Sequence, residues 1–225
     1  GAMLAEVQEA SRQLERSGDV ASQRTALMAL AALGSRGGDA AVRTIAKQLE
    51  APDPTIRKVA LQALVQVAPR GDDKVVRAVA ARARDEDVGV KLAALRSLPE
   101  VAVKGDRSLI TSLGFCMEDE DDRVRRAAVE AMGEVALDGD DRAISVFVAI
   151  MRDPDPRVRR LVIDKLNYTV HRGDKRAIDA LADCQSDEDA AVRYAAVMCL
   201  PQVADRGDRT IIGTIQRFLA DPDPG

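Results

Sequence analysis

Residues 153–166 read DPDPRVRRLVIDKL, and residues 119–132, which begin 34 positions earlier, read DEDDRVRRAAVEAM. Both stretches join an acidic turn to a Val-Arg pair and an apolar helical stripe. One glycine column and one aspartate column repeat with the same step along the chain. These columns are Gly37, Gly71, Gly105, Gly139, Gly173 and Gly207, and Asp19, Asp53, Asp87, Asp121, Asp155 and Asp189. Two independent columns with one period predict a repeat protein.

Each period contains two helical patterns. The first has apolar residues three and four positions apart, as in Val42, Ile45 and Leu49, which form one face of a helix. The second is rich in alanine, so neighbouring second helices can approach closely. An aspartate before proline, as in Asp53-Pro54, is typical of a helix N-terminus. No stretch shows strand alternation, and the sequence predicts an all-α protein of stacked helix pairs.

The period places about 13 helices along the chain. We expect helix pairs at 4–36, 39–70, 73–104, 107–138, 141–172 and 175–206, with a lone helix at 209–220, in a single solenoid over 4–225. Residues 1–3 resemble a cleavage scar. The lone helix keeps a core stripe of Ile212, Ile215 and Leu219 with nothing after it, so we expect a fragment of a longer array that self-associates weakly through that helix.

Composition excludes several classes of function. The 225 residues are 46% apolar, 31% charged and 2% aromatic, with a net charge of −4, no Trp, a single His and three Cys. An acidic chain with few aromatics disfavours nucleic-acid binding. One histidine, His171, disfavours metal sites and acid–base catalysis, so we expect no metal and no cofactor. No apolar run suits a membrane span. The unpaired cysteines favour the cytoplasm.

The stretches at 119–132 and 153–166, with SDEDAAVRYAAVMCL at 186–200, resemble HEAT repeats, most closely the short repeats named for phycobilisome lyases. This resemblance implies a right-handed α-solenoid. It also implies a non-catalytic scaffold that binds a protein or peptide along a concave face lined by the second helices. The alternative is a subunit of a bilin-lyase-type or other enzyme that uses the same groove.

The resemblance further implies a ladder of aspartate and arginine side chains between neighbouring repeats. By residue match, the members are Asp53 with Arg57, Asp121 with Arg125, Asp155 with Arg159, and Asp189 with Arg193. Gln23 and Lys91 occupy the arginine position in the first and third repeats, so the ladder should be weaker there.

The non-core positions of the second helices vary from repeat to repeat, which suits recognition of one irregular partner but also neutral drift on a solvated face. The candidate partner-binding residues are Arg126, Arg160, Tyr168, Tyr194, Met198, Glu134 and Asp164. Three of these residues, Tyr168, Tyr194 and Met198, group with Asn167 and His171 as a possible interface core.

A second local feature is a set of arginines at the starts of two adjacent second helices: Arg123, Arg125, Arg126, Arg157, Arg159 and Arg160. They could form a basic stripe for an acidic or phosphorylated segment. The acids within a few residues favour the other interpretation, a solvated helix start with neutralised charges.

Two further motifs are interpreted as structural. The Arg-Gly-Asp tripeptides at 70–72, 172–174 and 206–208 fall in the turn of the repeat, where glycine and aspartate have capping functions. The three cysteines, Cys116, Cys184 and Cys199, fall on core-facing positions without an electropositive neighbourhood, which predicts inert thiols.

Overall fold

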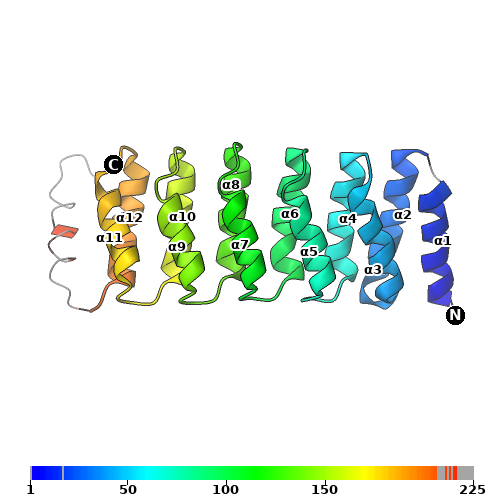
Figure 1. Ribbon diagram of the computed structural model, residues 1–225, viewed down its shortest axis with the longest axis horizontal. Coiled ribbons are helices and arrows are strands. Elements are labelled where there is room, and N and C mark those ends of the chain that lie inside the picture. The colour runs from blue at the N-terminus through cyan, green and yellow to red at the C-terminus, as the bar shows by residue number, and fades with distance from the viewer. Residues whose placement is uncertain (1, 17, 207–210, 212, 214, 217–225) are drawn as a thin grey trace. The chain divides into compact units, whose positions relative to one another are not determined.

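The computed structural model describes residues 2–16, 18–206, 211, 213, 215 and 216, and throughout that part the regular elements are helical (Figure 1). Twelve α-helices and three short 3₁₀ segments occur within it. The expected lone helix at 209–220 lies largely outside the described residues. The chain divides into two compact units, Gly1–Val103 (unit 1) and Lys104–Gly225 (unit 2).

The described residues of unit 1 form three helix pairs, and the two helices of a pair run antiparallel (Figure 1). Each second helix packs against the first helix of its own pair, and α4 also packs against α2 and α6. The first helices are α1 (Ala2–Arg16), α3 (Gly38–Lys47) and α5 (Asp73–Arg82), and the second helices are α2 (Val20–Ala32), α4 (Pro54–Val67) and α6 (Val88–Val101). The 3₁₀ segments Gly34–Gly37 and Gln48–Glu50 flank α3.

Unit 2 repeats the arrangement, with the second helix α10 packed between α8 and α12. Its first helices are α7 (Arg107–Cys116), α9 (Asp141–Ile150) and α11 (Lys175–Asp183), and its second helices are α8 (Asp122–Val135), α10 (Pro156–Thr169) and α12 (Ala190–Val203). A 3₁₀ segment, Cys184–Ser186, extends α11. In this unit too, each second helix packs against the first helix that precedes it in the chain.

The repeated aspartates start the helices. Asp155 accepts a hydrogen bond of 2.8 Å from the Arg157 N–H, and Asp53 accepts one of 2.6 Å from the Thr55 N–H. In each case a proline follows at the first helical position, where its missing N–H costs nothing. Asp72, Asp106 and Asp174 cap the first helices in the same way. These caps explain why the aspartate positions recur so strictly.

The repeated glycines join one helix pair to the next. Gly105 has a φ of +82°, a conformation that side chains disfavour. Its N–H donates a 2.7 Å hydrogen bond to the carbonyl of Val135 in the following repeat, and a Cβ there would meet Leu137 at 2.7 Å. Gly71, Gly139 and Gly173 also have positive φ and donate to the next repeat. Glycine is thus required both by backbone conformation and by close approach.

The arginine of the Arg-Gly-Asp turns is also engaged in the fold. Arg70 donates to the carbonyls of Pro99 and Ala102, and Arg172 donates to those of Pro201 and Ala204. These carbonyls lie at the C-terminus of the next second helix, where they have no helical donor. Each of the two turns therefore uses its arginine, glycine and aspartate to connect repeats. The third turn lies mostly outside the described residues.

The core of each unit is the space between its two rows of helices. In unit 2 the largest fully buried side chain is Phe147 of α9, with Ile144 beside it and Leu113 on α7. In unit 1 the expected stripe of Val42, Ile45 and Leu49 is buried. A helix pair cannot bury such a stripe alone, so the repeats must stack.

Candidate functional site

The outward side of the second helices in unit 2 carries all seven candidate partner-binding residues. Helix α10 packs between α8 and α12, and each of the three helices contributes three residues spaced four positions apart. Arg126 is half-buried and the other positions are exposed. We call this surface the second-helix face: Arg126, Glu130 and Glu134 on α8, Arg160, Asp164 and Tyr168 on α10, and Tyr194, Met198 and Gln202 on α12.

A hollow of about 420 Å³ opens on this face between α10 and α12. Its floor is apolar and consists of Ile163, Ala195 and Cys199. Around the floor stand the side chains of Arg160, Asp164, Asn167, Tyr168, Tyr194 and Met198. The structure therefore brings five of the seven candidate partner-binding residues into one hollow. The other two, Arg126 and Glu134, lie on α8 and do not line it.

Three large side chains of the hollow are strongly exposed. Tyr168 is 77% exposed, Tyr194 56% and Met198 55%. These are three of the nine large hydrophobic residues that are exposed in the described part of the chain, and they share one hollow. His171, which the sequence groups with them, instead lies against Gly139, whose Cβ would overlap the imidazole ring. An exposed apolar group of this kind marks a contact site more often than an isolated residue does.

The arginines at the starts of α8 and α10 are mostly neutralised by nearby acids. Arg123 pairs with Asp121 at 2.6 Å, and Arg157 pairs with Asp155 at 2.6 Å and with Asp122 at 3.1 Å. Arg126 also pairs with Asp122, at 3.3 Å. Arg125 and Arg159 turn inward, as described below. The six arginines therefore do not form a free basic stripe.

Arg160 is the exception. Within the described residues its side chain has no ion pair and no hydrogen bond, and it stands at the rim of the hollow. The sequence explains the difference from Arg126. The residue four positions before Arg126 is Asp122, whereas the residue four positions before Arg160 is Pro156, which has no carboxylate.

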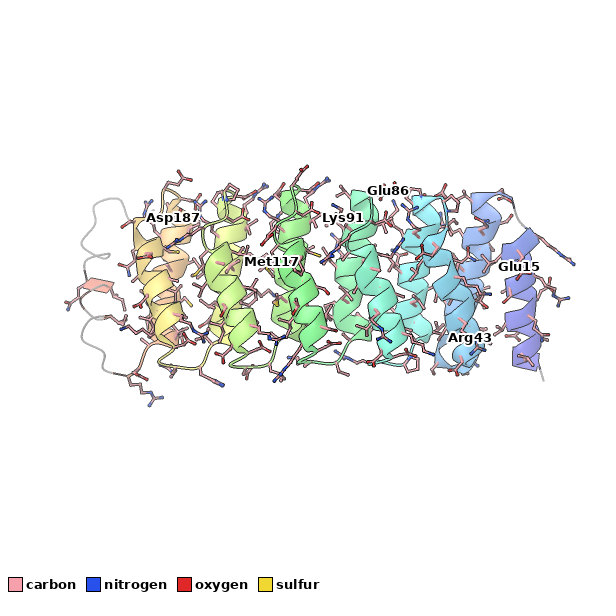
Figure 2. All side chains as sticks on the ribbon, viewed as in Figure 1. Glu15, Arg43, Glu86, Lys91, Met117 and Asp187 are labelled. Atoms are coloured by element: carbon pink, nitrogen blue, oxygen red, sulfur yellow. The ribbon has the colours of Figure 1, made fainter. Side chains whose placement is uncertain are left out.

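Three ladder arginines each contact an aspartate of the next repeat, and in each case it is a different aspartate from the one expected. Arg159 donates two hydrogen bonds to Asp187, at 2.6 and 2.8 Å, and further bonds to the carbonyls of Asp153 and Pro154. Arg125 makes the same bidentate contact with Asp153. In unit 1, Arg57 pairs with Asp85 at 2.7 Å through one nitrogen. Figure 2 shows Asp187 in the loop before α12.

The expected ladder aspartates, Asp53, Asp121, Asp155 and Asp189, are helix caps. The acceptor is the aspartate two residues earlier, in an Asp-x-Asp turn. Asp187, for example, also accepts the N–H of Asp189 at 2.9 Å. The first acid of the turn faces the arginine of the preceding repeat while the second caps its own helix. Arg193 donates to the carbonyls of Asp187 and Glu188. Sequence reasoning missed Asp85, Asp153 and Asp187, although they too recur every 34 residues.

The arginine that follows a cap lowers the pKa of the capping carboxyl. The Arg157 guanidinium and N–H hold the pKa of Asp155 at about 2, below its ordinary value of 3.8. A lowered pKa means that the folded state favours the carboxylate. The cap therefore contributes stability above pH 4, which is lost as the pH falls toward 2.

Replacing Arg157 by glutamine should raise the pKa of Asp155 toward its ordinary value, because the strongest hydrogen bond to the carboxylate is removed. The acid loss of stability at this cap then begins at a higher pH. Carboxyl carbon NMR during a pH titration measures this shift. Arg152→Gln is the control, since Arg152 is exposed and pairs only loosely with Asp183, at 3.8 Å. An unchanged Asp155 titration in Arg157→Gln would contradict the assignment.

The cysteines are buried, and burial suppresses thiolate formation. Desolvation raises the pKa of Cys184 to about 11 and that of Cys199 to about 12. Cys199 lies in the floor of the hollow, but a thiol with such a pKa stays protonated near neutral pH and is a poor nucleophile. The floor of the hollow is therefore a packing surface.

The described residues contain no group of three or more His, Cys, Asp or Glu side chains arranged to hold a metal ion. In the same part of the chain, helices that combine the length and apolar character needed to cross a bilayer do not occur.

Comparison with known proteins identifies the family. A family model of HEAT repeats matches residues 8–99, 76–167 and 111–201, and together these matches cover most of the chain. The chain is a HEAT-repeat protein. The matched windows include both rows of helices and the ladder arginines. No curated protein sequence matches this HEAT-repeat protein significantly.

Solved structures of similar fold are repeat solenoids. The X-ray structure of YibA from E. coli has a TM-score of 0.63 and 18% identity, covering 98% of this HEAT-repeat protein and 78% of that chain. A designed armadillo repeat protein in complex with the peptide (KR)₄ has a TM-score of 0.60 and 16% identity, covering 90% and 100%. A computationally designed armadillo protein for modular peptide recognition has a TM-score of 0.59 and 17% identity, covering 87% and 99%. At these identities the likeness shows the fold alone.

Proposed function

We propose that this protein is a non-catalytic scaffold that binds another protein, through an extended segment of that partner, along the second-helix face of unit 2. The observation that carries the proposal is the hollow between α10 and α12, where Tyr168, Tyr194 and Met198 are exposed together above an apolar floor. Tyrosine and methionine are enriched in interface cores, and tyrosine supplies contact area with little loss of conformational entropy.

Two further points support a binding role. The second helices are held by caps and by the arginine ladder, so the exposed side chains stand on rigid elements and little ordering is needed on binding. One designed armadillo protein of similar fold is in complex with the peptide (KR)₄, and another was designed for modular peptide recognition. We extend that use to this chain as part of the proposal.

Affinity capture with quantitative mass spectrometry tests the function. The bait is the full chain, compared with a Tyr168→Ser/Tyr194→Ser variant and with Phe115→Ser, which alters a 57% exposed aromatic on first helix α7. We expect a protein that the wild type and Phe115→Ser retain equally and that the double variant loses by about 30-fold, the effect of removing a central contact residue.

The retained protein is then cross-linked to the bait, and the cross-links should map to α10 and α12. If the three baits capture the same proteins in the same amounts, the second-helix face is not the binding surface and the proposal is wrong.

A further inference from the structure

The charges that remain unpaired on the second-helix face are mainly negative. Glu130, Glu134 and Asp164 are exposed, and in the described part of the chain their carboxylates take part in no ion pair. Arg126 is neutralised by Asp122. Among the described residues nearby, the unpaired cations are Arg160, near the N-terminus of α10, and Lys165. An excess of carboxylates therefore surrounds the middle and the C-terminal end of the face.

Lys165 does not cancel this excess. Its aliphatic stem lies across Gly133 of α8, where a Cβ would meet the Lys165 Cδ at 2.7 Å, and the side chain is half-buried between the two helices. Lys165 supplies one positive charge, whereas Glu130, Glu134 and Asp164 supply three negative charges. A cationic ligand can therefore pair with exposed acids here without displacing an existing ion pair.

The hollow adds two features that suit a basic segment with an apolar residue. The apolar floor, with Met198 at the rim, accepts a hydrophobic side chain, and Asp164 stands beside it. The rings of Tyr168 and Tyr194 are exposed enough to receive an ammonium or guanidinium group over their faces.

We infer that the segment bound at this face is an extended basic peptide that seats one apolar side chain in the hollow between α10 and α12 and places Lys or Arg side chains against Asp164, Glu130 and Glu134. This inference rests on the proposed function and names the chemistry of its partner. Neighbouring second helices lie about 10 Å apart, and an extended chain advances about 3.3 Å per residue. The hollow lies about one and a half of these helix spacings from α8, so the basic residues lie within about four or five positions of the apolar one.

The protein contains its own reporter for this contact. It has no Trp, and its only two Tyr residues, Tyr168 and Tyr194, both line the hollow. A tryptophan placed at the apolar position of a peptide is thus the sole indole in the mixture. Energy transfer from tyrosine to that tryptophan, with a blue shift of its emission, reports that the indole is buried close to the two rings that line the hollow.

The test titrates the full chain with three matched nonapeptides. Each has a central tryptophan, serine and glycine spacers, and four flanking residues that are lysine, glutamine or glutamate. We expect the lysine peptide to bind about tenfold more tightly than the glutamine peptide, the combined effect of a few exposed ion pairs, and the glutamate peptide to bind most weakly. The preference should shrink as salt rises from 50 to 500 mM, because exposed charges are screened.

Variants assign the effect to the named carboxylates. In the double variant Glu134→Gln/Asp164→Asn, the dissociation constants of the lysine and glutamine peptides should lie within about threefold of each other. Glu118→Gln/Glu120→Gln removes the same charge from exposed positions outside the face and should leave the preference unchanged. Met198→Ser should weaken the binding of all three peptides by the same factor, because it removes apolar contact and no charge.

Two results would overturn the inference. If the glutamate peptide binds best with tyrosine-to-tryptophan transfer, the hollow binds peptides but the basic chemistry is wrong, and the proposed function stands. If no peptide gives the transfer signal, the hollow is not a peptide anchor. The affinity capture then decides the proposed function separately, through the dependence of its cross-links on Tyr168 and Tyr194.

Discussion

Replacing Arg159 by methionine is expected to lower the free energy of unfolding by about 3–5 kcal/mol, the cost of removing one member of a buried ion pair. The side chain is only 7% exposed and Asp187 only 11%, so solvent screens the pair little. Without the guanidinium, Asp187 loses its charged partner and the carbonyls of Asp153 and Pro154 lose a donor. Urea denaturation followed by circular dichroism measures the loss.

The neighbouring residue supplies the control. Arg160→Met removes the same group from an exposed side chain and should change stability by less than about 0.5 kcal/mol. A double variant, Arg159→Met/Asp187→Asn, should lose less than the sum of the single changes by about 1–3 kcal/mol, because the two groups interact directly. Additive effects would show that Arg159 stabilises the protein by some other means.

Replacing Phe147 by alanine is expected to cost about 3–5 kcal/mol, because it leaves a cavity in the core of unit 2. Phe147 is fully buried and is the largest such side chain in the described residues. Tyr168→Ala removes a similar ring from a site that is 77% exposed and should cost less than about 0.5 kcal/mol.

Hydrogen exchange locates the effect of Phe147→Ala. Repeat proteins can unfold in parts, so the amides of α9 and its neighbours in unit 2 should lose protection first. Equal losses of stability in the Phe147 and Tyr168 variants would show that the packing described for α9 is wrong.

The fold could be predicted closely from the sequence because its determinants are local. Three local features define each helix pair: an aspartate before a helix, a glycine after one, and apolar residues three or four positions apart. Because these features recur in each repeat, they are easy to recognise in the sequence. The structure confirms the all-α fold and the caps at Asp53 and Asp155.

The ladder could not be assigned from the sequence. Each turn offers two aspartates, and which one faces the preceding repeat depends on the path of the turn. Asp153 points toward Arg125 while Asp155 caps α10. For a similar reason, the sequence predicts only some of the residues that line the hollow. The sequence indicates the exposed tyrosines, but Ile163 and Asn167 contribute to it through packing between α10 and α12.

The spacing of the ladder has a consequence for how such a chain grows. Where both side chains are present, an arginine and its acceptor lie 28 residues apart, as Arg125 and Asp153 do, so a 34-residue repeat that has both carries one donor and one acceptor. Duplication of such a repeat therefore also creates the ion pair that connects the copy to its neighbour, without any new mutation. An insertion of another length inside the 28-residue interval must bulge out as a loop or break the pairing. Gene duplication in whole repeats can lengthen this architecture while each added surface stays free to diverge.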